Sequence, residues 1–114
     1  MKRIAIPVKE GKLSEYFGQC GYYEIFEIEN GSILANTLEI PPLEDIEKLP
    51  KWIENQNITD VIAHKIDNRI ISLFSNLKIN LFIGIPINKT ENLVDDYLNG
   101  LLKSDSNIIE DITK

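Results

Sequence analysis

Residues 60–84 read DVIAHKIDNRIISLFSNLKINLFIG, and this stretch decides the fold. Short apolar runs at 60–63 and 80–84 predict two buried strands. Between them, Asp67 or Asn68 is expected to cap a helix over about 68–77, where apolar residues recur at helical spacing. Because a strand–helix–strand connection is right-handed and joins parallel strands, we expect the two strands to be parallel neighbours in one sheet.

Three further strands are predicted in the first 40 residues, over about 2–8, 22–29 and 32–40. Asn30-Gly31 separates the last two strands, and this pair is a strong hairpin signal because both residues tolerate a positive φ. Pro41-Pro42 is expected to end the third strand, since proline donates no hydrogen bond to a sheet. We expect the strand at 60–63 to lie beside the first strand.

A short helix is predicted over about 50–56, between the hairpin and the strand–helix–strand unit. Pro50 suits the first helical position, where a missing N–H costs nothing. Trp52 and Ile53 are expected to face the core, and Asn57 is expected to close the helix in the left-handed conformation.

The last helix is expected to follow a capping-box-like pair, Asn88 and Glu91, with Thr90 as the alternative cap, and to end near Gly100. The order of elements is then βββαβαβα, an α/β fold with a mixed sheet of five strands. We expect one domain over residues 1–102, followed by a polar tail or loose helix over 103–114. The expected core residues are Ile4, Ile6, Phe26, Val61, Ile62, Phe74, Leu81 and Ile83.

The composition limits the classes of function. The chain has 114 residues and a formal net charge of −6, so it lacks the basic surface that nucleic-acid binding requires. A single cysteine cannot form an intrachain disulfide, which favours a reducing compartment. No apolar run is long enough for a membrane span. These features predict a cytoplasmic protein that binds neither nucleic acid nor membrane.

The only cysteine and the only histidine are both expected at one edge of the sheet. Ligands of open α/β sheets bind outside the carboxyl ends of parallel strands, where the loops 9–20, 64–68 and 85–89 should meet. Gly18 and Gly21 flank Cys20 and give its loop access to positive φ. Two alternatives stay open: Cys20 as a small buried side chain, and His64 as an exposed loop histidine.

One thiolate and one imidazole are too few ligands for a structural zinc site or a resident iron–sulfur cluster. Two ligands can hold a preassembled cluster transiently, or contribute to a site shared between subunits. The sequence contains no Cys-His-Asn signature, no nucleophile elbow and no glycine-rich phosphate loop after a strand. We therefore expect a binding protein rather than an enzyme.

Four blocks of the chain are similar to the dinitrogenase iron-molybdenum cofactor biosynthesis family. They are Ile4-Ala-Ile-Pro-Val8, Leu13-Ser-Glu-Tyr-Phe-Gly-Gln-Cys20, Leu49-Pro-Lys-Trp-Ile53 with Thr59-Asp-Val-Ile-Ala63, and Tyr97-Leu-Asn-Gly100. The resemblance covers roughly residues 2–102. It implies a ribonuclease H-like fold and a non-catalytic role in binding or carrying iron–sulfur or iron–molybdenum clusters, with cluster-assembly proteins as partners.

The chain departs from the family pattern in the loop over 9–20 that carries Cys20, here called the cysteine loop, where Tyr16 and Gln19 replace two histidines. The site implied by the resemblance then has Cys20 and His64 as metal ligands. The residues expected around the cluster are Ser14, Phe17, Gly18 and Arg69. The lost histidines favour an alternative, a metal-free protein-interaction or regulatory module on the same fold. A third possibility is an enzyme that acts on a small anionic molecule at this edge.

Overall fold

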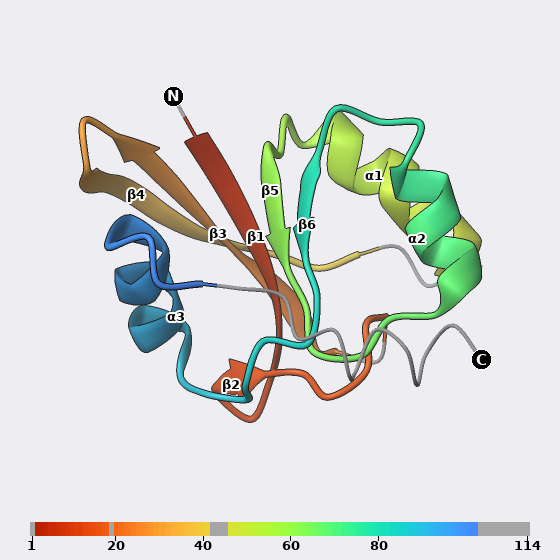
Figure 1. Cartoon of the computed structure of the whole chain (residues 1–114), viewed down its shortest axis with the longest axis horizontal. Helices are drawn as coiled ribbons and strands as arrows, with labels where there is room; N and C mark the ends of the chain where they lie inside the picture. Colours follow the sequence, from red (N-terminus) through yellow and green to blue (C-terminus); the bar gives the residue numbers. More distant parts are fainter. Residues whose placement is uncertain (1, 19, 42–45, 103–114) are drawn as a thin grey trace.

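The computed structural model describes residues 2–18, 20–41 and 46–102, which form a mixed α/β fold (Figure 1). The chain order of the elements is β1 (Lys2–Lys9), β2 (Lys12–Leu13), β3 (Tyr22–Glu29), β4 (Ser32–Glu39), the 3₁₀ turn η1 (Ile46–Lys48), α1 (Leu49–Asn55), β5 (Asp60–Ile62), α2 (Asn68–Phe74), β6 (Asn80–Phe82) and α3 (Thr90–Leu98). The expected tail over 103–114 lies outside the described residues. No helix of the described part is long and apolar enough to cross a membrane.

The sheet has the order β4-β3-β1-β5-β6, with β2 paired to β1. β1 pairs antiparallel with β3, and β3 pairs antiparallel with β4. β1 pairs parallel with β5, and β5 pairs parallel with β6. The predicted crossover is thus confirmed, and so is the expected position of the strand at 60–63 beside the first strand.

The prediction of five strands was wrong by one, because the chain after β1 turns back to form β2. Glu10 has φ 55° and Gly11 has φ 78°, which are the positive values of a tight hairpin turn. A paired segment of two residues is too short to show an alternating pattern, so only the turn could have revealed it. The predicted hairpin at Asn30-Gly31 is confirmed, with φ values of 53° and 77°.

The first two helices follow their predicted starts. Pro50 lies in the first turn of α1, and Asn57 beyond its end has φ 62°, the expected left-handed conformation. At α2, the Asp67 side chain accepts a hydrogen bond of 2.8 Å from the backbone N–H of Arg69, so Asp67 is the cap. α2 ends at Phe74, three residues early, where Ser75 donates its hydroxyl hydrogen bond to the Ser72 carbonyl.

The predicted capping of α3 was wrong. Lys89 is the N-cap residue, and no side chain caps the helix there. The Asn88 side chain instead accepts hydrogen bonds from the backbone N–H of Lys89 at 2.8 Å and from the Asn92 amide at 3.0 Å. Gly100 follows the helix with φ 69°, as its position predicted.

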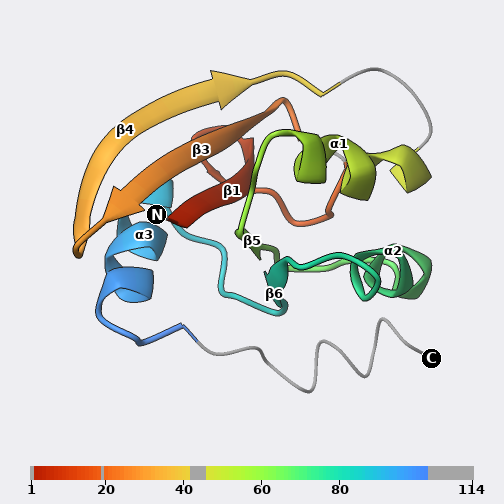
Figure 2. The ribbon, with the colours of Figure 1, turned by 90° about the horizontal axis from the view of Figure 1, so that it is seen from above.

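The buried residues form one cluster on each face of the sheet. Figure 2 shows helices on both sides of the twisted sheet. α1 and α2 pack on the face of Ala5, Tyr23 and Val61. α3 packs on the opposite face. Of the predicted core residues, seven are buried, namely Ile4, Ile6, Phe26, Val61, Ile62, Phe74 and Ile83. Leu81 is only partly buried, because β6 is the last strand of the sheet.

Candidate functional site

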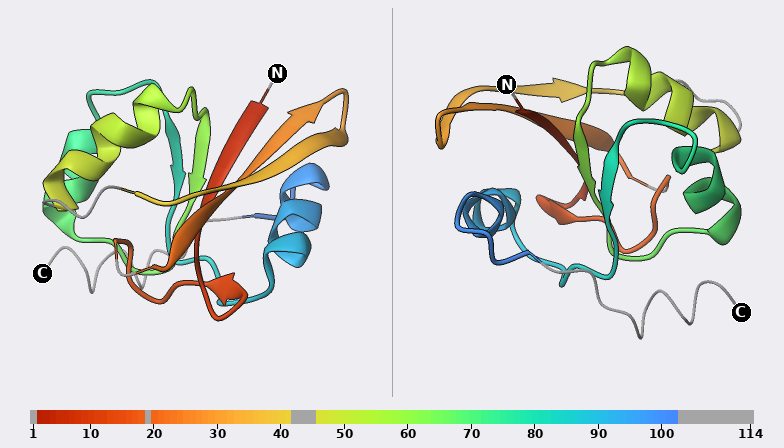
Figure 3. Two further views of the ribbon diagram at one scale, coloured as in Figure 1. Left: turned by 180° about the vertical axis from the view of Figure 1, so that it is seen from behind. Right: turned by 45° about the horizontal axis from the view of Figure 1, so that its top comes forward.

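The loops that follow β1, β5 and β6 meet at one end of the sheet, as predicted (Figure 3). Backbone hydrogen bonds join the first two loops: Phe17 N–H donates to the Lys65 carbonyl at 2.8 Å, and Lys65 N–H donates to the Glu15 carbonyl at 3.0 Å. The third loop joins through Leu13 N–H, which donates to the Asn88 carbonyl at 3.0 Å. The edge is therefore one connected surface made by three distant segments.

The cysteine loop starts and ends on β1. Ser14 N–H donates to the Pro7 carbonyl at 2.8 Å, and Gly21 N–H donates to the Val8 carbonyl at 2.9 Å. Gly18 has φ 93°, a conformation that favours glycine, so this part of the prediction is confirmed. Gly21 does not have a positive φ, so its expected role was wrong. A Cβ added at Gly21 would lie 3.7 Å from the Val8 carbonyl oxygen, which is an ordinary contact distance.

Two predicted site residues hold this loop on the core. The Ser14 side chain is buried, and its hydroxyl donates a hydrogen bond of 3.0 Å to the Tyr16 carbonyl. The Phe17 ring is buried in edge-to-face contact with Tyr23 and Phe74, at centroid distances of 6.0 and 5.8 Å. Both side chains are therefore buried beneath the loop and fix its conformation on the core.

Cys20 is half-buried and packs against the core beside Tyr23. Burial raises the pKa of the Cys20 thiol, and interactions with the Tyr23 hydroxyl and with backbone groups offset the rise in part. The Tyr23 hydroxyl is fully buried and lacks a well-formed hydrogen bond within the described residues. Burial and the neighbouring Cys20 both raise the pKa of Tyr23 well above its usual value, so the hydroxyl keeps its proton.

His64 is partly exposed at the carboxyl end of β5. Its Nδ1 lies 2.9 Å from the Ile85 carbonyl oxygen. Because a carbonyl only accepts hydrogen bonds, Nδ1 carries the proton, and the lone pair of the neutral ring is on Nε2. A backbone carbonyl that fixes the ring in this way is a common support for a metal-binding histidine.

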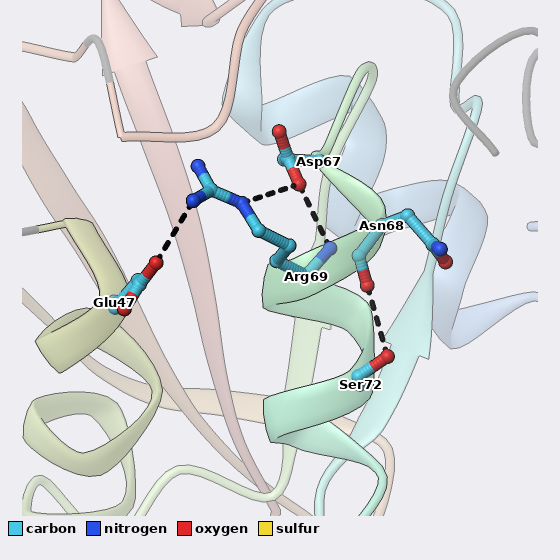
Figure 4. Close-up of polar contacts among 5 residues, drawn as sticks. All are labelled: Glu47, Asp67, Asn68, Arg69 and Ser72. Carbon is cyan, nitrogen blue, oxygen red and sulfur yellow. Dashed lines mark hydrogen bonds and ion pairs between the residues drawn. The ribbon is translucent and has the colours of Figure 1, made fainter. Parts of the chain in front are cut away.

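Arg69 extends along the surface of α2 toward η1 (Figure 4). Its guanidinium pairs with Asp67 at 3.4 Å and with Glu47 at 3.0 Å. The side chain is 69% exposed, so these pairs contribute little stability. Two acidic neighbours already offset the charge that was predicted to face a cluster.

The structure joins the loops of Cys20 and His64, but it gives the two side chains different partners, Tyr23 and Ile85. A common cleft for them stays a prediction. The described residues contain no group of three or more histidine, cysteine or carboxylate side chains arranged to hold a metal ion. Gln19 of the same loop lies outside the described residues.

A shallow pocket of about 210 Å³ opens beside the cysteine loop. Its lining contains two lysines and two glutamates, and the full set is Lys9, Glu10, Lys12, Leu13, Ser14, Glu15 and Ile87. Two more lysines belong to the same edge. Lys89 pairs through its backbone with Lys12, and the Lys65 ammonium lies 5.2 Å from the ring centroid of Tyr16. Each of the three loops thus brings at least one lysine to the edge.

The profile of the dinitrogenase iron-molybdenum cofactor family matches residues 1–100. The chain belongs to this family. It is 29% identical over 87 residues to the uncharacterized protein MJ0580 of Methanocaldococcus jannaschii, a match that covers 72% of this chain and 74% of that protein.

Two solved structures share the fold over nearly the whole chain. The crystal structure of PH0822 has a TM-score of 0.83 and 25% identity, and the match covers 90% of this chain and 94% of that one. The apo form of the orange protein from Desulfovibrio gigas has a TM-score of 0.75 and 11% identity, with coverage of 93% and 94%. At this low identity the second likeness concerns the fold alone.

In this member of the dinitrogenase iron-molybdenum cofactor family, the sequence did not predict two features of the edge: the contact between Tyr23 and Cys20, and the group of four lysines. Tyr23 was predicted only as part of the strand over 22–29, because its contact with Cys20 depends on how the loop returns to β1. The four lysines are scattered over residues 9–89 and resemble ordinary solvated side chains. Only the convergence of the three loops brings them to one surface.

Proposed function

We propose that the protein is a small, non-catalytic cytoplasmic accessory protein that binds or carries an iron–sulfur or iron–molybdenum cluster at the carboxyl edge of its sheet. Its partners would be cluster-assembly proteins. The membership of the chain in the dinitrogenase iron-molybdenum cofactor family supports this class of function. The observation that carries the proposal is the contact of Cys20 with the buried hydroxyl of Tyr23, which has no well-formed hydrogen bond within the described residues.

The chemistry of this pair fits a sulfur-rich cluster. A thiolate is a soft ligand that suits iron and related metals. A buried hydroxyl without a well-placed acceptor costs free energy, and a cluster-bound thiolate or sulfide would accept its hydrogen bond. Tyr23 would then donate its hydrogen bond to sulfur and orient the ligand. Residues that hydrogen-bond a metal ligand without binding the metal commonly have this role.

His64 is proposed as the second ligand, through Nε2. Its Nδ1 is engaged by the Ile85 carbonyl, so the lone pair on Nε2 is the free one. Ser14, Phe17 and Gly18 would hold the shape of the cysteine loop. Arg69, at the adjacent helix start, would contribute charge to a cluster only by exchanging its pairs with Asp67 and Glu47.

The lysines of the edge suit an anionic cargo. Lys9, Lys12, Lys65 and Lys89 come from all three loops, in a chain whose net charge is −6. They outnumber the two glutamates of the pocket lining, Glu10 and Glu15, of which Glu15 pairs with Lys65 at 3.4 Å. Local positive charge in an acidic protein attracts anions to that surface. We also propose the ribonuclease H-like assignment of the fold, which the order β4-β3-β1-β5-β6 supports.

Anaerobic reconstitution with iron and sulfide, followed by metal analysis of the desalted protein, tests the proposal. Cys20→Ala should lose most of the bound iron, and His64→Ala should lose less, because water or buffer can fill its position. Tyr23→Phe should bind iron more weakly than wild type. The matched control is Tyr22→Phe, which removes a hydroxyl from the neighbouring residue of β3 and should bind like wild type. Equal iron uptake by wild type and the Cys20→Ala/His64→Ala protein would refute the ligand assignment.

The alternative is a metal-free interaction module on the same edge. It is favoured by two exposed side chains of the edge: Tyr16, which replaces a family histidine and is 46% exposed, and Ile87 of the third loop, which is 45% exposed. Exposed aromatic and apolar side chains are typical of protein-binding surfaces. The same reconstitution separates the two functions, since a wild-type protein that takes up no iron under these conditions supports the interaction module.

A further inference from the structure

Lys65 joins the loop of His64 to the cysteine loop. Its N–H donates to the Glu15 carbonyl at 3.0 Å, and its carbonyl accepts from the Phe17 N–H at 2.8 Å. These two bonds make an isolated parallel bridge between Lys65 and Tyr16. Because His64 directly precedes Lys65, the bridge holds the chain beside His64 on the cysteine loop.

The side chains of the two bridged residues also meet. The Lys65 ammonium lies 5.2 Å from the centroid of the Tyr16 ring, within the range of a cation–π contact. The same ammonium is 3.4 Å from Oε2 of Glu15. The side chains of Lys65 and Glu15 are 38% and 52% exposed, so this ion pair alone contributes little. The aromatic ring thus adds a contact to a connection that is otherwise short and close to water.

The other anchors of the two loops do not connect them to each other. Gly84 N–H donates to the His64 carbonyl at 2.8 Å, and Nδ1 of His64 lies 2.9 Å from the Ile85 carbonyl oxygen. The cysteine loop is anchored separately, through the buried ring of Phe17. The third loop therefore orients His64, the core holds the cysteine loop, and the bridge at Lys65 sets one relative to the other.

We propose that Tyr16 is a positioning residue of the site. Through its contact with Lys65 it keeps the cysteine loop and His64 together, so that one cluster takes both Cys20 and His64 as ligands. This inference rests on the proposed function. A site whose ligands are held in place before binding loses less conformational entropy when it binds. Loss of the Tyr16 ring should therefore weaken the contribution of His64 and leave that of Cys20.

Hydrogen exchange measured by NMR tests the contact in the metal-free protein. Tyr16→Ala should speed exchange of the Lys65 N–H about two- to fivefold, which corresponds to the loss of one exposed cation–π contact. Tyr16→Phe keeps the aromatic face and should exchange like wild type. Lys65→Met should also speed exchange. Lys51→Met is its matched control, since Lys51 pairs with Glu54 on α1, and should leave exchange unchanged. Unchanged exchange in Tyr16→Ala would overturn the inference.

The rate of iron release to a chelator, after anaerobic reconstitution with iron and sulfide, tests the positioning role. Tyr16→Ala should release iron about two- to fivefold faster than wild type, and Tyr16→Phe should release it at the wild-type rate. In a His64→Ala protein, Tyr16→Ala should have no further effect, because the ligand that Tyr16 positions is absent. An equal acceleration in both backgrounds would show that Tyr16 does not act through His64, and would overturn the proposal.

The outcomes separate this inference from the proposed function. A wild type that takes up no iron refutes the proposed function, and the positioning role with it. A wild type that holds iron, together with a Tyr16→Ala protein that releases it at the same rate, refutes the positioning role alone. Tyr16 is 46% exposed, so its substitution should leave the fold intact, which circular dichroism should verify.

Discussion

Tyr97 donates a hydrogen bond of 3.0 Å from its hydroxyl to Oδ2 of Asp60, and this bond ties α3 to the start of β5. Asp60 is 1% exposed, and it also accepts hydrogen bonds from the Thr59 hydroxyl at 2.7 Å and from the Asn80 amide at 2.9 Å. Three donors thus satisfy a buried carboxylate at the amino ends of the parallel strands, on the edge opposite the proposed site. The network stabilises the fold.

We expect the stability of the protein to fall at alkaline pH because of Tyr97. Burial, and then the charge and hydrogen bond of Asp60, raise the pKa of Tyr97 to about 12. Because the pKa is higher in the folded state, the protonated hydroxyl makes its full contribution to stability below a pH of about 10, the pKa in the unfolded state. This contribution is lost as the pH rises from about 10 through about 12. Chemical unfolding at a series of pH values measures the loss. In Tyr97→Phe this part of the slope should disappear, and an unchanged slope would contradict the assignment.

Asp60→Ala should destabilise the protein by about 2 kcal/mol, because it removes the hydrogen bonds that the buried carboxylate accepts from the exposed Asn80 amide and the partly buried Tyr97 hydroxyl. Urea unfolding gives the free energy directly. Asp95→Ala on the exposed face of α3 is the matched control and should change stability by about 0.5 kcal/mol or less. Similar values for the two variants would show that the Asp60 network contributes nothing beyond a surface charge.

Phe74→Ala should cost about 3–5 kcal/mol of stability, since it removes a large side chain from a packed core. Phe74 is 2% exposed, and its ring lies 5.8 Å from that of Phe17, so the cavity would open beneath the cysteine loop. Thermal unfolding compared with Leu73→Ala, whose side chain is 38% exposed, provides the measurement and its control. An unchanged melting temperature for Phe74→Ala would contradict the packing described for α2.

The fold was predictable where local patterns agree with long-range rules. Apolar runs joined by a helix required parallel neighbours, and Asn30-Gly31 required a hairpin; both are present. The errors arise where one side chain has several possible partners. Asn88 was expected to cap α3, but its carbonyl oxygen bonds the next backbone N–H and Asn92, and the helix begins after Lys89 without a side-chain cap.

The candidate site was predictable only in outline. Sheet topology placed the loops of Cys20 and His64 at one edge, and hydrogen bonds between those loops bear this out. The partners of the two side chains depend on the loop conformations, which no periodicity encodes. Tyr23 alternates in sequence like any core residue of a strand, and only the return of the loop to Val8 brings Cys20 against its hydroxyl.

Native Cys20 should react slowly with iodoacetamide at neutral pH, because burial raises the pKa of its thiol and only the thiolate reacts. The rate should keep rising at pH values where an exposed thiol has levelled off. The interaction with the Tyr23 hydroxyl lowers the pKa of Cys20, so Tyr23→Phe should move the midpoint of the pH–rate profile higher, whereas Tyr22→Phe should leave it in place. Mass spectrometry follows the reaction without ambiguity, since the chain has one cysteine. A midpoint that stays fixed or moves lower in Tyr23→Phe would mean that this hydroxyl does not stabilise negative charge on the sulfur, and its proposed role beside a bound cluster would lose its basis.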